Sequence, residues 1–179
     1  MNNAKNMIET AIVNLINDFK NYPDKYLTES DVRCSLVNEL MKNPEFNKIQ
    51  NTEDNSKSIP LHTEVRWYGH SGRLKWRSDI VIIDVNSLRV KRDIFRLPSK
   101  GFGFNKPKAI IEIKLRRING ESNSAFISKI KQDINRLNRI RAEIVGNYFC
   151  GLVILDKKEN IVQEITAIEN NIELYYQAV

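Results

Sequence analysis

This sequence of 179 residues contains few cysteines, few histidines and no long apolar run. Each of these scarcities excludes a class of protein or a kind of site. The two cysteines, Cys34 and Cys150, lie far apart and in no CxxC or Cys/His ligand pattern, which excludes a disulfide framework and a zinc site. We expect both to be small core residues. The two histidines, His62 and His70, flank a candidate strand, and we interpret them as structural.

No apolar run approaches the ~18–20 residues that are needed to span a bilayer. The first residues, MNNAKNMIET, lack the apolar region of a signal peptide. We therefore expect a cytoplasmic protein without a membrane partner. The hydrophobic content of 41% and the length are typical of one globular domain, so we predict a single domain over residues 1–179.

Negative charge is scarce in the middle of the chain. Residues 66–117 contain 14 Lys and Arg against 4 Asp and Glu, whereas the rest of the chain contains 14 against 18. A concentrated basic zone attracts polyanions over a Debye length of about 8 Å at physiological salt. Nucleic acid is therefore the leading candidate partner, with a merely solvated basic surface as the alternative.

The hydrophobic pattern predicts alternating helices and strands. The expected elements are helices over 7–20 and 28–43, strands over 62–69, 78–84 and 108–115, a helix over 125–141, a strand over 149–156 and a helix over 160–176. Residues 47–58 read as an exposed loop, and residues 86–107 as a basic, irregular excursion. This order indicates an α/β fold with a mixed sheet flanked by helices.

The second predicted helix has a clear start signal. Thr28 is its expected N-cap, and Asp31 follows three residues later as in a capping box. Glu29 is spaced so that it shares a helical face with Leu36 and Leu40, which we expect to point inward. For the helix over 125–141, the expected cap is a serine at 122 or 124.

The run KAIIEIKL places Glu112 and Lys114 inside an apolar strand. Side chains alternate along a strand, so Ile111, Ile113 and Leu115 should share one face, and Glu112 and Lys114 the other. A solvent-facing ion pair, worth no more than about 1 kcal/mol, would explain the pair without a function. The two charged residues alone do not decide between such an ion pair and a catalytic role.

Asp79 favours a catalytic role for Glu112 and Lys114, because it comes directly before the apolar run IVII of the preceding strand. A carboxylate there can lie beside that of Glu112 on the next strand. Two adjacent carboxylates repel one another unless a cation lies between them, so the pair indicates Mg²⁺ or Mn²⁺. The nearby ammonium group of Lys114 would stabilise the charge of a phosphoryl transition state.

Asp79, a strand, an excursion and then Glu112-Ile113-Lys114 together resemble the PD-(D/E)xK nuclease superfamily. The resemblance implies a restriction-endonuclease-like core of mixed central sheet and flanking helices in the order α-β-β-β-α-β, here over about residues 28–156. It also implies hydrolysis of phosphodiester bonds with a divalent metal ion as cofactor. The motif itself is short and degenerate.

Transferred to this sequence, the resemblance assigns the metal to the carboxylates of Asp79 and Glu112 and the backbone carbonyl of Ile113. Lys114 would orient or activate the attacking water, and Glu29 matches a glutamate that many members supply from the helix before the first strand. Two departures stand out. The motif's proline is Ser78 here, and where some members have Gln-x-x-x-Tyr this chain has Gln132 followed by Arg136.

Further candidates surround this set. Glu64, Lys129, Gln132 and Asp133 are candidates for a supporting shell, with ordinary solvated positions as the alternative for the three helical ones. The residues expected to contact nucleic acid are Arg77, Arg92, Arg96, Lys100, Lys106, Arg116 and Arg117. Lysines and arginines interleaved with phenylalanines suit phosphate contacts and base stacking.

We hypothesise a single-domain, divalent-metal-dependent nuclease, with an endonuclease acting on DNA favoured by the resemblance. The alternative is a catalytically silent nucleic-acid-binding module that keeps the basic surface. A homodimer and a subunit of a larger defence or repair complex both remain open.

Overall fold

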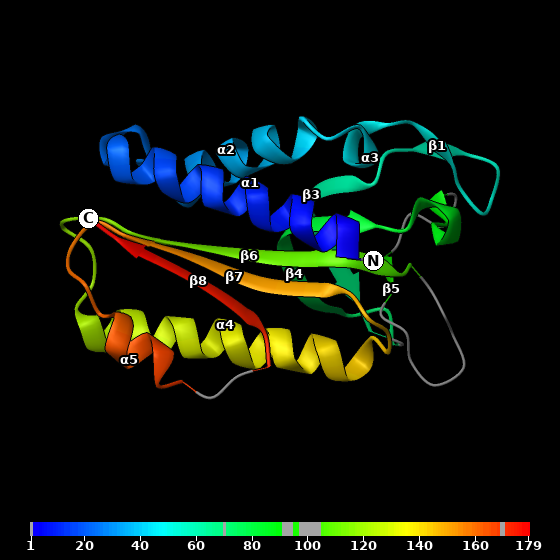
Figure 1. Ribbon diagram of the computed structural model, residues 1–179. Coiled ribbons are helices and arrows are strands. Elements are labelled where there is room, and N and C mark those ends of the chain that lie inside the picture. Colours follow the sequence, from blue (N-terminus) through cyan, green and yellow to red (C-terminus); the bar gives the residue numbers. More distant parts are fainter. Residues whose placement is uncertain (1, 70, 91–94, 97–104, 169–170) are drawn as a thin grey trace.

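The fold is a six-stranded mixed sheet with helices on both sides, as a computed structural model that describes residues 2–69, 71–90, 95–96, 105–168 and 171–179 shows (Figure 1). The strand order is β5-β3-β4-β6-β7-β8. The strands are β3 (Leu61–Tyr68), β4 (Leu74–Ile83), β5 (Phe95–Arg96), β6 (Pro107–Arg116), β7 (Phe149–Asp156) and β8 (Glu173–Ala178). Strands β3, β4 and β6 pair antiparallel, whereas β6, β7 and β8 pair parallel.

Helices form a layer on each face of the sheet (Figure 1). One layer holds α1 (Asn2–Asn21), α2 (Glu29–Met41) and the short α3 (Pro44–Asn47), and the other holds α4 (Asn123–Glu143) and α5 (Val162–Thr166). Two short 3₁₀ helices, η1 (Pro23–Lys25) and η2 (Val85–Ser87), lie in connections. The described elements thus include the predicted α/β order: α2, β3, β4, β6, α4, β7.

Local sequence signals explain where the main helices begin. Thr28 caps α2 by accepting a hydrogen bond from the backbone N–H of Asp31, whose carboxylate accepts in return from the N–H of Thr28, so the predicted capping box is confirmed. Ser122 caps α4 through the N–H of Ala125, which settles the choice between the two serines.

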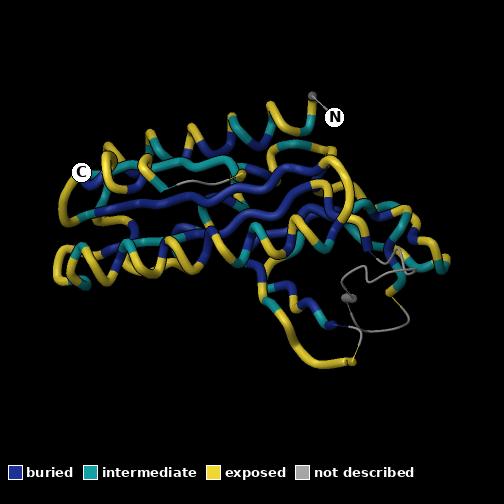
Figure 2. Tube along the Cα trace, turned by 90° about the horizontal axis from the view of Figure 1, so that it is seen from below, coloured by how far each residue is buried: buried dark blue, intermediate teal, exposed yellow. Residues whose placement is uncertain are grey.

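Alternation along the strands produces two apolar cores, one on each face of the sheet. Ile111 and Ile113 of β6 pack in the core beneath α1 and α2, whereas Ile110 packs in the core above α4. Buried positions therefore concentrate on the strands, while the outward faces of the helices are exposed (Figure 2). Glu112 and Lys114 share the face of Ile110, as predicted, and both contact residues of α4.

Strands β4 and β6 separate where the charged residues begin. Their pairing runs from Ile83 and Pro107 to Ile80 and Ile111, and it stops there. Beyond that point β4 continues toward its start paired with β3, and β6 continues to Arg116 paired with β7. The sheet therefore opens between Asp79 and Glu112.

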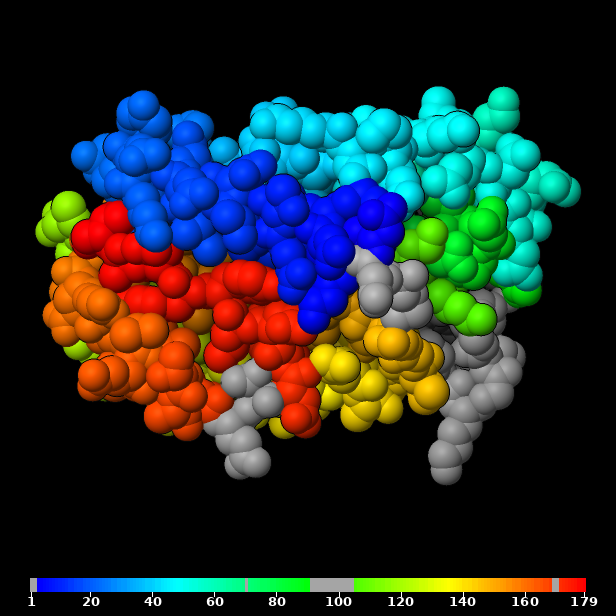
Figure 3. Space-filling view, viewed as in Figure 1, coloured from blue at the N-terminus to red at the C-terminus, as the bar shows by residue number. Residues whose placement is uncertain are grey.

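The C-terminal prediction was wrong. Residues 160–176 form a helix only over α5, five residues long, and the chain then adds β8 as an edge strand parallel to β7. Tyr175 packs in one core and Tyr176 in the other, which is the alternation of a strand. Lys5 of α1 pairs with Glu173 at 2.6 Å, and in the space-filling view α1 (blue) and β8 (red) share the surface (Figure 3).

Two smaller expectations also need correction. The loop predicted over 47–58 contains a short antiparallel pair, β1 (Gln50–Asn51) and β2 (Lys57–Ser58). Cys150 is buried as predicted, but Cys34 is exposed on α2. Among the described residues, no helix combines the length and the apolarity that crossing a bilayer requires.

Candidate active site

The opening between β4 and β6 forms a cleft of about 350 Å³. Its walls come from four elements: α2, β4, β6 and α4. The lining residues are Glu29, Leu74, Lys75, Trp76, Arg77, Asp79, Glu112, Lys114, Asp133 and Arg136. Four of these were candidates for chemistry from the sequence: Glu29, Asp79, Glu112 and Lys114. They span 85 positions of the chain but lie in one cleft.

Asp79 occupies the point at which the two strands part. Its Oδ2 accepts a hydrogen bond of 2.9 Å from the backbone N–H of Ile113, so the side chain takes the place of the next ladder bond. Its Oδ1 lies 3.2 Å from the guanidinium of Arg33 on α2. The carboxylate is thus fixed to β6 and remains on the wall of the cleft.

Glu112 is the most deeply buried carboxylate of the cleft, with 3% of its surface exposed. Its Oε2 lies 2.9 Å from Arg136 of α4, while its Oε1 is buried and has no hydrogen-bond partner in the described part of the chain. Burial raises the pKa of this carboxyl to about 8; Arg136 opposes the rise, and the negative charges of Asp79 and Asp133 add to it. An added cation beside Oε1 would favour the ionised form.

Lys114 lies two residues after Glu112, on the same face of β6. Its Nζ is 2.9 Å from Asp133 of α4 and 3.6 Å from Glu29 of α2. Burial lowers the pKa of Lys114, but the two carboxylates, Asp133 foremost, outweigh this effect and raise it overall. The ammonium group therefore stays charged and lies between the carboxylates of Asp133 and Glu29.

Glu29 reaches the site from a different position than the sequence predicted. Leu36 and Leu40 are buried as expected, but Glu29 begins α2 and keeps 46% of its side chain exposed. Its Oε1 accepts a weak hydrogen bond of 3.4 Å from the N–H of Leu115. It belongs to the cleft because of its place at the start of the helix, and not as part of an inward apolar stripe.

Of the supporting residues proposed from sequence, two hold the site in place. Asp133 is buried and pairs with Lys114 and with Arg136, 2.7 Å away. Glu64 adopts a left-handed backbone conformation with φ of 54° and pairs with Arg33 and, at 3.0 Å, with Arg77. Arg33 thereby joins Glu64 to Asp79.

The other two supporting candidates lie away from the cleft. Lys129 pairs with Glu121 at 2.8 Å and is 54% exposed on its side chain, and Gln132 is exposed on α4. Both precede Asp133 on the helix, but neither lines the cleft. The helix contributes Arg136 instead, one turn after Asp133, at the position where the sequence departs from Gln-x-x-x-Tyr.

The basic residues predicted to contact nucleic acid divide into three groups. Arg77 lines the cleft, and Arg117 is exposed just past β6. The prediction for Arg116 was wrong, because this residue is 1% exposed and forms a buried ion pair with Asp156. Lys106 lies away from the cleft, beside a second cavity at the other end of β6. Arg92 and Lys100 lie outside the described residues, and Arg96 is described only by its backbone in β5.

Sequence reasoning missed Lys75 and Trp76, which line the cleft beside Arg77. Lys75 and Arg77 precede Asp79 on β4 by four and by two residues, and the ladder with β3 shifts register beside Lys75. Lys75 pairs with Glu143 of α4 at 2.6 Å, and Arg77 pairs with Glu64 of β3 at 3.0 Å. The predicted strand began only at Ser78, so the strand pattern did not include either residue. Arg66 of β3 lies opposite Arg77 and is exposed as well.

The donor groups suit a divalent cation that prefers oxygen ligands. Nowhere in the described ranges are three Asp, Glu, His or Cys side chains gathered closely enough to enclose a metal ion on their own. Mg²⁺ is commonly held by one or two carboxylates together with waters and substrate phosphates, and Asp79 and Glu112 meet this smaller requirement. The free and buried Oε1 of Glu112 is the atom that most clearly lacks a partner of this kind.

Comparison with known proteins adds no relative. No protein-family model, no curated protein and no solved structure matches this chain.

Proposed function

We propose that this protein is a divalent-metal-dependent nuclease with a restriction-endonuclease-like core of the PD-(D/E)xK type. The observation that supports it is the convergence of Asp79, Glu112 and Lys114 on one open cleft, at the point where β4 and β6 separate. A solvent-facing ion pair would not need a carboxylate 33 positions earlier on the neighbouring strand, nor a glutamate that is 3% exposed.

Each residue has a distinct task in this proposal. Asp79 and Glu112 hold Mg²⁺ or Mn²⁺, with the backbone carbonyl of Ile113 as a further ligand. When bound, the metal ion polarises the phosphate and lowers the pKa of a coordinated water from about 15.7 toward 7. Lys114, kept charged by Asp133, donates hydrogen bonds to the attacking water and to the phosphate, and Asp133 keeps its ammonium group in position.

The substrate in this proposal is nucleic acid, with DNA favoured over RNA by the resemblance. Support for a polyanion comes from two cationic side chains of β4 that line the cleft: Lys75 and Arg77 are both exposed. A phosphate backbone that follows β4 would pass these cations before it reaches Lys114.

A catalytically silent binding module is the second candidate, and one observation favours it. Each carboxylate of the cleft already has a cationic side chain beside it: Arg33 at Asp79, Arg136 at Glu112, and Lys114 at both Glu29 and Asp133. Ion pairs of this kind can serve only to hold helices onto a sheet. The two candidates differ in whether a divalent cation binds and supports cleavage.

Metal removal is expected to abolish cleavage by the wild-type protein. Purified protein is incubated with plasmid, single-stranded DNA and RNA in Mg²⁺, in Mn²⁺ or in EDTA, and the products are separated on denaturing gels. Cleavage should appear with either metal ion, vanish in EDTA and return when Mg²⁺ is added in excess. No cleavage of any substrate, together with salt-dependent binding of DNA, would support the silent module instead.

Lys75→Gln with Arg77→Gln is expected to weaken duplex DNA binding about 10-fold at 0.15 M salt, because two phosphate contacts are lost. The slope of log affinity against log salt should fall in magnitude by about 2, since each phosphate contact contributes roughly 1. Fluorescence anisotropy in EDTA measures both quantities. Lys20→Gln with Lys57→Gln removes the same charge from exposed positions outside the cleft, so equal losses in the two double variants would contradict a binding surface on β4.

A further inference from the structure

The two carboxylates proposed to hold the metal ion are each paired with an arginine, and the two arginines come from opposite helical layers. Arg33 of α2 lies 3.2 Å from Asp79, and Arg136 of α4 lies 2.9 Å from Glu112. An arginine does not lose its proton at any pH that a protein experiences. A divalent cation can therefore reach Glu112 only by competing with a permanent positive charge.

Arg136 is the more replaceable of the two counter-ions. Arg33 is held through both terminal nitrogens, Nη1 by Glu64 and Asp79 and Nη2 by Ser30 at 2.9 Å. Its side chain is 18% exposed, against 33% for Arg136. Both short contacts of Arg136, to Glu112 and to Asp133, use the same nitrogen, Nη2. Its Nε is buried and without a hydrogen-bond partner. The guanidinium is thus attracted by charge but is not bound in a two-point geometry.

Glu112 complements this arrangement. One of its oxygens contacts Arg136 and the other has no partner, although the residue is almost fully buried. A buried carboxylate is strongly unfavourable without a neighbouring positive charge, so Arg136 provides in the metal-free protein the charge that a metal ion would provide. Asp133, three residues earlier on α4, remains as an anchor for Arg136 once its contact with Glu112 is lost.

A guanidinium released into this cleft would be free to bind an anionic group of the substrate. Its planar donors match two oxygens of a phosphate group, which makes arginine better suited than lysine to such a contact. Arg136 lines the same cleft as Lys114, Lys75 and Arg77. A cation on Glu112 and a phosphate beside it would therefore both favour the displaced position of Arg136.

We propose that Arg136 is the counter-ion that a divalent cation displaces from Glu112, and that the released guanidinium then binds a phosphate oxygen of the substrate. This inference rests on the proposed nuclease function. It gives Arg136 two effects of opposite sign: competition with the metal ion before catalysis, and contact with the substrate during it.

Arg136→Gln is expected to bind Mg²⁺ at least about fivefold more tightly than the wild type, because the competing charge is gone. Isothermal titration calorimetry measures the affinity over a range of pH. The values are compared on the high-pH plateau of each protein, because loss of Arg136 raises the pKa of Glu112 and so adds proton competition at lower pH. Arg139→Gln is the matched control: it removes the same charge from an exposed position on the same helix, outside the cleft. Its Mg²⁺ affinity should equal that of the wild type.

Single-turnover cleavage at saturating Mg²⁺ supplies the second readout. Arg136→Gln should cleave about 10²-fold more slowly despite its tighter metal binding, as expected when one donor to the phosphate is removed. Arg136→Lys, which keeps the charge without the planar fork, should recover most of the competition with Mg²⁺ and little of the rate. It also serves as the test variant if the glutamine variant does not fold.

The outcomes separate this inference from the function on which it rests. If the wild type cleaves and Arg136→Gln binds Mg²⁺ with unchanged or lower affinity, the displacement is rejected while the nuclease stands. If the variant binds Mg²⁺ more tightly and cleaves at the wild-type rate, the phosphate contact is rejected. A wild-type protein that neither binds Mg²⁺ nor cleaves rejects both proposals.

Discussion

Asp79→Asn and Lys114→Ala are each expected to lower the single-turnover rate of phosphodiester cleavage by about 10²–10³-fold. Asp79→Asn keeps the shape of the side chain but removes a full negative charge from the proposed metal ligand. Lys114→Ala removes the donor beside the attacked phosphate, and loss of a single such donor typically costs 10²–10³ in rate, or about 2.7–4 kcal/mol. Quench-flow with a labelled duplex at saturating Mg²⁺ measures the rate.

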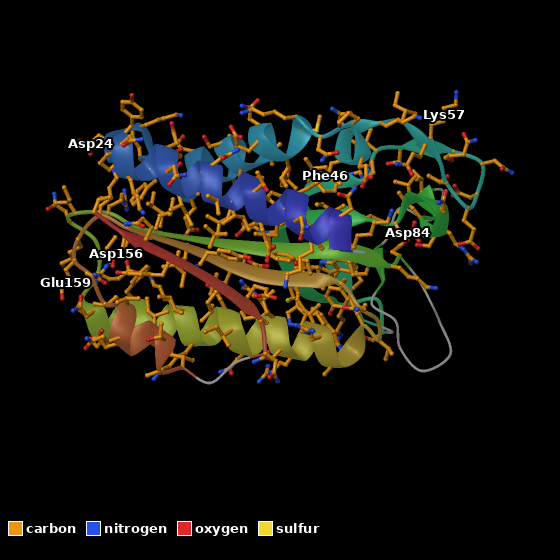
Figure 4. The ribbon with its side chains drawn as sticks, viewed as in Figure 1. Asp24, Phe46, Lys57, Asp84, Asp156 and Glu159 are labelled. Atoms are coloured by element: carbon orange, nitrogen blue, oxygen red, sulfur yellow. The ribbon has the colours of Figure 1, made fainter. Side chains whose placement is uncertain are left out.

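The same two strands offer matched controls at their other end. Asp84 follows β4 directly, and Lys108 lies on β6 with its Nζ 3.9 Å from the Asp84 carboxylate. In Figure 4 Asp84 lies at the end of the sheet opposite to Asp156. Asp84→Asn and Lys108→Ala should therefore retain cleavage within about twofold of the wild type. Rates that survive in the Asp79 and Lys114 variants as well would reject the proposed catalytic set.

Arg116→Ala is expected to lower the free energy of unfolding by about 3–5 kcal/mol, because it leaves Asp156 charged and buried without its partner. Both side chains are fully buried, with Arg116 Nε 2.9 Å from Asp156 Oδ1. Asp156 also accepts a hydrogen bond of 3.2 Å from the hydroxyl of Tyr176 in β8. The pair thus joins β6, β7 and β8 at the end of the sheet where Asp156 and Glu159 lie (Figure 4).

Urea denaturation followed by circular dichroism measures this change. Arg117→Ala, at the exposed neighbouring position, should change stability by less than about 0.5 kcal/mol. Arg116→Met with Asp156→Leu removes both charges and should regain most of the lost stability. A small effect of Arg116→Ala on stability, with a large effect on DNA affinity, would return Arg116 to the binding surface on which sequence reasoning placed it.

The features that could be predicted from sequence are those that neighbouring residues determine. The capping box depends on two residues three positions apart, Thr28 and Asp31. The alternation of side chains between the two faces of β6 can be recognised within ten consecutive residues. These local signals were sufficient to place Glu112 and Lys114 on one face. They were also sufficient to propose that Asp79 lies nearby, because it comes directly before the apolar run IVII of the neighbouring strand.

The features that were missed depend on partners distant in sequence. Arg116 looks like an exposed base beside Arg117 until Asp156, 40 positions later, is known to lie against it. Residues 173–178 have a mixed apolar and polar pattern, and only the open edge of β7 makes them a strand. Arg136 could not be assigned to the site because its role depends on how α4 is rotated over the sheet, which the spacing of its apolar residues constrains only to within a face.

Strand β6 carries packing and chemistry in the same ten residues, and this has a consequence for how the protein can change. A shift of one residue between β6 and its neighbours would turn Glu112 and Lys114 toward the apolar layer beneath α1 and α2, and bring Ile111 and Ile113 into the cleft. An insertion or deletion inside this strand would therefore disrupt both the apolar packing and the candidate active site. Variation in activity among descendants of this sequence should arise by exchange of side chains on one side of β6, while its length stays constant.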